Sequence, residues 1–126
     1  MTDGDIPDQA KQFLLHHIDS IAQWEGLLCL RLNAGKDLDA AAIARHLYIT
    51  PENAAGLMTR LVSRGLVAVT DGHIFRYAPA TPELDQVVTL TADLYRQYLI
   101  PITNLIHSRP KSRVQEFANA FRIRKD

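Results

Sequence analysis

The sequence predicts a mainly α-helical α+β fold that contains one small β-hairpin. Between residues 38 and 78, two short helical segments are followed by two β-prone runs separated by a turn signal. Helical patterns also occupy both flanks of this region, and the 126 residues contain no internal repeat. The chain is therefore expected to form one domain with appended helices.

Two helices are expected before residue 38. Pro7 can open the first helix, and Ser20 is the expected N-cap of the second, IAQWEGLLCLRLN, because its hydroxyl can accept a hydrogen bond from a free backbone N–H. Trp24 belongs to the apolar stripe of the second helix, so we expect it to be a core residue rather than a ligand-stacking one. Gly35 suits the left-handed backbone at the end of that helix.

The segment 38–78 contains a helix, a tight turn, a second helix and a hairpin. Asp39 can cap the helix AAAIARHL, and Thr50, which is followed by proline, marks the start of a helix over 51–64 that stops at Gly65. Asp71-Gly72 predicts a tight hairpin turn between the two β-prone runs. This order is that of a winged helix-turn-helix, in which the second helix lies in the major groove of DNA.

The same segment resembles winged helix-turn-helix transcriptional regulators of the MarR type. The resemblance rests on the run LMTRLVSRGLVAV, where Gly65, Leu66 and Val67 make the step from helix to wing, and on the turn 49–51. It implies a regulator that binds double-stranded DNA and dimerises through helices outside the winged core. The helix over 51–64 would then be the recognition helix.

The outward face of this helix supplies the candidate DNA-reading residues. Arg commonly reads guanine and Asn reads adenine, so Asn53, Thr59 and Arg60 are expected to contact bases. Gly56 costs about 1 kcal/mol relative to alanine in mid-helix, so we expect it to serve the close approach of a partner, either nucleic acid or protein. The expected contacts to the phosphate backbone are Thr50, Arg64 and Arg76.

The charge of the chain leaves a second function open. Lys and Arg together number 14, as do Asp and Glu, so there is no general attraction to nucleic acid. The expected wing tip, 69–73, carries no Lys or Arg, whereas a wing that binds phosphate normally has more positive charge. The alternative is a winged-helix module that contacts a protein partner and has no sequence-specific DNA binding. Basic residues near the C-terminus form either a solvated surface or an accessory contact.

Residues 81–126 are expected to form a C-terminal helical extension to a winged domain over 1–80. Thr81 and the proline after it start a long helix whose apolar residues recur in steps of four and three, the pattern of a helix–helix seam. Pro101 should kink or break this helix, and a capping box at 112–115 predicts a last short helix. We expect a symmetric homodimer, the alternative being a helix buried within one chain. The candidate dimer contacts are Leu84, Val88, Tyr95, Tyr98, Ile102, Leu105, Phe117 and Phe121.

Other function classes find little support in the sequence. We expect no signal peptide, and no apolar run comes near the ~20 residues that span a bilayer. Cys29 is the single cysteine and is expected to be buried, and a chain without an internal disulfide suits the cytoplasm. The five histidines lack the pairing of a helical zinc site, and no phosphate loop or nucleophile elbow occurs. We therefore expect no metal, no cofactor and no enzymatic activity.

Overall fold

The computed structural model describes residues 6–108 and confirms the mainly helical α+β fold. In chain order the elements are α1 (Asp8–His17), α2 (Ile21–Leu32), β1 (Leu38–Asp39), α3 (Ala40–Leu47), α4 (Pro51–Ser63), β2 (Val67–Thr70), β3 (Ile74–Tyr77), α5 (Pro82–Gln97) and α6 (Leu99–His107). Within residues 6–108, no helix is long and apolar enough to cross a membrane.

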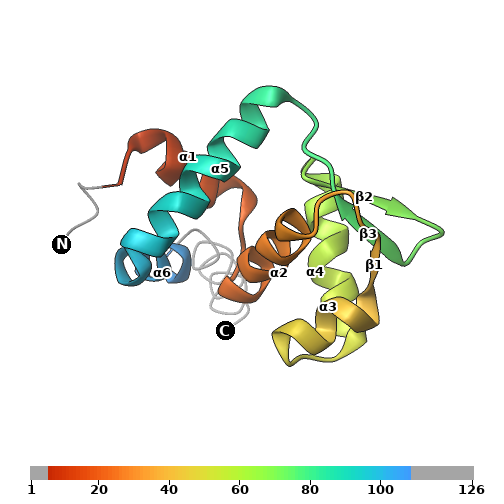
Figure 1. The fold of residues 1–126 in the computed structure, drawn as a ribbon. Helices are drawn as coiled ribbons and strands as arrows, with labels where there is room; N and C mark the ends of the chain where they lie inside the picture. The colour runs from red at the N-terminus through yellow and green to blue at the C-terminus, as the bar shows by residue number, and fades with distance from the viewer. Residues whose placement is uncertain (1–5, 109–126) are drawn as a thin grey trace, which may run out of the picture.

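Helix α2 lies between two groups of elements (Figure 1). On one side α1 packs against α5 and α6, and on the other side lie α3, α4 and the small sheet. Helix α1 therefore packs mainly against the C-terminal helices. A single cluster of buried apolar side chains runs from Ile6 to Ile106, and the division of the chain near residue 80 stays a prediction.

Four helices begin at the side chains that the sequence indicates. Ser20, Asp39, Thr50 and Thr81 each accept a hydrogen bond from the backbone N–H three residues further on, at 2.8–3.1 Å. Such a cap satisfies one of the donors that a helix start leaves free, and replacing it by alanine typically costs about 1 kcal/mol. The four predicted caps are confirmed, and they fix where α2, α3, α4 and α5 start.

The wing is a three-stranded antiparallel sheet with the strand order β1-β3-β2. Asp71 and Gly72 join β2 to β3 with φ values of 57° and 77°, as a tight hairpin turn of the predicted kind requires. Strand β1 is not predicted from the sequence. This strand has two residues, Leu38 and Asp39, which pair with Phe75 and Ile74, and it is too short to show the alternating pattern of a strand.

The predicted break in the C-terminal helix is confirmed and lies at Tyr98. Helix α5 ends at Gln97, and Pro101 is the third residue of α6. Proline has no N–H to donate to the carbonyl of residue 97, so one continuous helix would lose that hydrogen bond. The two shorter helices both pack against α1. The expected last helix, with Phe117 and Phe121, lies outside the described residues.

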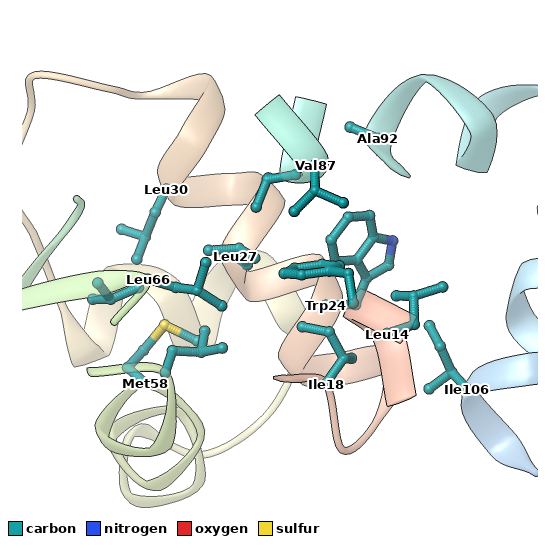
Figure 2. Packing of buried hydrophobic residues seen from close by; sticks show 14 of the residues in the cluster. Leu14, Ile18, Trp24, Leu27, Leu30, Met58, Leu66, Val87, Ala92 and Ile106 are labelled. Carbon is teal, nitrogen blue, oxygen red and sulfur yellow. The ribbon is translucent and has the colours of Figure 1, made fainter. Parts of the chain in front are cut away.

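Trp24 lies at the junction of the two groups of elements and is fully buried. Figure 2 shows it among Leu14 of α1, Val87 of α5 and Ile106 of α6. Its ring also lies edge-on to that of Tyr95, with 5.8 Å between the ring centroids. Aromatic pairs at this distance and angle add to the free energy of burial. Trp24 is therefore a core residue, as the sequence predicts, and Cys29 on the same helix is also buried.

Candidate nucleic-acid interface

Helix α4 has one buried side and one exposed side. Ala54, Met58 and Leu61 are in the core, where they hold the helix against α2 and α3. The other side is exposed along the whole length of the helix and consists of Glu52, Asn53, Gly56, Thr59, Arg60 and Ser63. We call this side the exposed face of α4. It unites four of the seven predicted DNA contacts on one surface.

The uncharged residues of this face are small or occupied in part by the helix itself. The Thr59 hydroxyl donates to the carbonyl of Ala55 at 2.8 Å, four residues earlier. An ideal Cβ at Gly56 would meet no neighbouring atom within 4 Å, so no contact within residues 6–108 explains this glycine. Thr50 precedes the face, and its hydroxyl accepts a hydrogen bond from the N–H of Asn53. The side-chain amide of Asn53 is exposed on this surface.

Arg60 and Arg64 both contact Asp19, in the turn between α1 and α2. One oxygen of Asp19 lies 3.2 Å from Arg60 and the other lies 3.1 Å from Arg64. Arg64 also donates to the carbonyl of His17 at 2.8 Å. The side chain of Arg60 is 66% exposed and that of Arg64 is 26% exposed. The two arginines therefore differ, since Arg60 can reach a partner and Arg64 mainly holds the turn to α4.

The wing contributes little positive charge. Arg76 is exposed on β3, an element separate from α4, and its guanidinium lies 3.9 Å from the carboxylate of Asp37. At the tip, a ring nitrogen of His73 lies 2.9 Å from the carbonyl oxygen of Asp71. The sequence already indicates that the wing has little positive charge, and the Asp37 carboxylate reduces this positive charge further.

Tyr48 is an exposed residue of the helix-turn-helix that the sequence analysis missed. It ends α3 in the left-handed region, with φ 60°, and is 94% exposed. Non-glycine residues are uncommon in this conformation. The apolar neighbours Leu47 and Ile49 make the run resemble a buried segment, so no local signal in the sequence reveals the exposure. Arg45, on the last turn of α3, is also exposed and forms no ion pair within residues 6–108.

Several predicted dimer contacts lie in the core of the single chain. Val88, Ile102 and Leu105 are buried among the chain's own helices. Tyr95 is half-buried and donates a hydrogen bond to Glu25 of α2, and its burial, together with that carboxylate, raises the pKa of its hydroxyl. Leu84 and Tyr98 are half-buried as well. The apolar side chains of α6 that remain exposed are Leu99 and Ile100.

His17, whose backbone carbonyl accepts a hydrogen bond from Arg64, is a titratable residue with a shifted pKa. Burial lowers the pKa of His17, and the charges of Arg64 and His16 act in the same direction. The hydrogen bond from the ring of His17 to the carbonyl of Phe13 partly opposes this shift. Within residues 6–108, no group of three or more His, Cys, Asp or Glu side chains could hold a metal ion.

Comparisons with known proteins identify the fold. No family model and no curated protein matches the sequence. The structure is similar to that of a multiple antibiotic-resistance repressor (MarR) from Listeria monocytogenes, with a TM-score of 0.50 and 18% identity over 94% of this chain and 84% of that chain. It is also similar to a MarR family transcriptional regulator from Streptomyces coelicolor, with a TM-score of 0.49 and 22% identity over 91% of this chain and 85% of that chain. The likeness to the Listeria structure confirms the winged helix-turn-helix fold.

Proposed function

We propose that this protein is a transcriptional regulator that binds duplex DNA by placing α4 in the major groove. The observation that carries the proposal is the exposed face of α4. A long, well-capped helix is held firmly on one side and leaves a polar side uncovered beside a β-hairpin wing. In a winged helix-turn-helix, this arrangement presents the second helix to base edges. The likeness to the MarR fold supports the same function by analogy.

The residues of α4 and its surroundings have separate roles in this proposal. Asn53 and Arg60 read bases, since an amide matches adenine and a guanidinium matches guanine, and Thr59 packs beside them. Thr50 and Arg76 contact the phosphate backbone. Tyr48 and Arg45, exposed at the turn before α4, are added as further phosphate contacts. Arg64 is assigned chiefly to holding the turn between α1 and α2 against α4.

We further propose that the regulator is a homodimer. Leu99 and Ile100 are large exposed apolar side chains next to each other at the start of α6, and a second copy of the chain would remove them from water. A two-fold dimer would place two α4 helices in successive major grooves. The half-sites would then lie about 34–36 Å apart, or a multiple of this distance.

A second function, that of a protein-contact module, is favoured by one observation. Arg60, Arg64 and Arg76 each lie within 4 Å of an aspartate oxygen, which lowers the positive potential that DNA binding uses. In this alternative the partner protein contacts the small residues of the exposed face, around Gly56 and Thr59. The two functions predict opposite results for binding to random-sequence duplex DNA.

Selection from random-sequence duplexes, followed by a salt series, tests the proposal. We expect enrichment of a palindromic site, with log affinity falling steeply as log salt concentration rises. Absence of both enrichment and binding near 50 mM salt would favour the protein-contact module.

Replacement of one arginine then tests the assigned face. Arg60→Ala should weaken specific binding by about 1–3 kcal/mol because a base contact is lost. The control is Arg96→Ala, which removes an exposed arginine from α5, outside the winged elements. Equal losses in the two variants would show that Arg60 acts only through net charge.

A further inference from the structure

The carboxylate of Asp19 binds Arg60 of α4 and Arg64, the residue that follows α4, and the position of Asp19 is itself fixed by hydrogen bonds. The N–H of Asp19 donates to the side-chain oxygen of Gln23 at 2.7 Å. Gln23 is fully buried and donates in turn to the carbonyl of Leu57 in α4, at 3.2 Å. We call Asp19, Gln23, Arg60 and Arg64 the Asp19 cluster. Asp19 is therefore linked by hydrogen bonds, through Gln23, to the same helix that presents the exposed face.

The two arginines of the cluster are held to different degrees. Arg64 contacts Asp19 and the carbonyl of His17, and it lies 3.5 Å from the side-chain oxygen of Gln23. Most of its side chain is buried. Arg60 is paired with Asp19 through one nitrogen at 3.2 Å, and two thirds of its side chain face solvent. Ion pairs this exposed contribute little to stability, so the guanidinium of Arg60 can change partners at low cost while Arg64 stays in place.

A guanidinium accepts a carboxylate, a phosphate or the edge of guanine as alternative partners, because all three offer oxygen or nitrogen acceptors in a suitable geometry. Asp19 is held by the buried Gln23 and lies in a turn beside α4, so it cannot follow Arg60 into a groove. Arg60 therefore has to leave Asp19 before it can bind an acceptor on DNA.

We propose that Asp19 is an internal competitor for Arg60: it occupies the guanidinium in the free protein and is displaced by DNA. Asp19 is thus a positioning residue that sets how tightly and at what salt concentration the regulator binds, and it acts through Arg60. This inference rests on the proposed DNA-binding function. It explains why the single arginine of the exposed face is paired with an acidic side chain from the turn between α1 and α2.

A double-mutant cycle tests the inference. Asp19→Asn and Arg60→Gln are made singly and together, and affinity for the selected DNA, or for a random duplex if selection yields no site, is measured by fluorescence anisotropy at several salt concentrations. Removing the competitor should tighten binding about two- to fivefold, the range corresponding to an exposed ion pair. The gain should vanish when residue 60 is glutamine. Glu52→Gln, which removes another negative charge from α4, is the matched control, and its effect should be the same with either residue at position 60.

The results separate the two proposals. If the wild type binds DNA and Asp19→Asn binds no tighter, or its gain persists without Arg60, the inference is overturned and the DNA-binding function stands. If only Asp19→Asn binds, Asp19 occupies Arg60 but DNA does not displace it, so the displacement and DNA binding by the wild type are both rejected. If neither binds, both are rejected. Unfolding is measured for every variant, and Asp19→Ser, which keeps an oxygen acceptor for Arg64, replaces Asp19→Asn if the latter does not fold.

Discussion

Replacing Gly56 by alanine should stabilise the protein and weaken its binding to DNA. Gly56 is in the interior of α4, and a Cβ added there meets nothing within 4 Å. The change therefore breaks no contact, while alanine is favoured over glycine in a helix by about 0.8–1.0 kcal/mol. For 126 residues, with an unfolding entropy of about 2.1 cal/mol/K per residue, this gain corresponds to a rise in Tm of about 3–4 °C.

The effect on DNA binding has the opposite sign. If Gly56 allows the helix backbone to approach DNA closely, the new methyl group occupies the space that the DNA needs, and affinity falls although the fold is more stable. Thermal unfolding followed by circular dichroism and DNA binding followed by anisotropy should be measured on the same preparation. Opposite shifts in the two measurements cannot arise from a general loss of structure.

Gly35→Ala is the matched control for the stability measurement. Its Cβ would also meet nothing within 4 Å, but Gly35 has φ +87°. An L residue in a left-handed conformation costs roughly 1–2 kcal/mol, so the same substitution should lower Tm there. A Tm for Gly56→Ala at or below the wild-type value would refute the argument from the open, exposed helix face. A raised Tm with unchanged DNA affinity would instead remove Gly56 from the DNA contacts.

Three further predictions concern the helix cap, a half-buried histidine and the proposed dimer. Thr50→Ala should lower the free energy of unfolding by about 1 kcal/mol because the cap of α4 is lost, while Thr50→Ser should retain most of it; equal denaturant midpoints for the two variants would contradict this. Because burial lowers the pKa of His17 below 6.5, the unfolded chain binds more protons there, and stability should fall as the pH drops below that value. His17→Gln should reduce this slope and His16→Gln should reduce it less, as measured by urea unfolding between pH 5 and 7.5. Ile100→Glu should shift the sedimentation equilibrium towards monomer and Leu32→Glu, at an exposed leucine of α2, should not; dimers in both variants would exclude α6 from the interface.

The sequence predicts those parts of the fold that depend on near neighbours. The caps at Asp39 and Thr50 and the turn at Asp71-Gly72 involve residues within three positions of each other, so their chemistry is visible in a short stretch of sequence. The exposed face of α4 is also predictable, because the helical period separates its polar residues from Met58 and Leu61.

Features that depend on distant contacts could not be predicted. The pairing of Asp19 with Arg60 joins residues 41 positions apart, and without it Arg60 and Arg64 appear equally available for DNA. The apolar rows of α5 and α6 indicate a seam, but a repeat of apolar residues does not say whether a second chain or α1 covers it. The structure shows that the chain's own core covers Val88 and Ile102.

The position of Trp24 gives the protein a spectroscopic probe of its own. It is the only tryptophan in the sequence, and its indole contacts Phe13 of α1 and Tyr95 of α5 while its backbone belongs to α2. Intrinsic fluorescence therefore reports on the junction between the terminal helices and the winged elements, without any added label. If emission and helical circular dichroism change together on denaturation, the two groups of elements unfold as one cooperative unit. If emission changes first, the terminal helices separate while the winged elements remain folded.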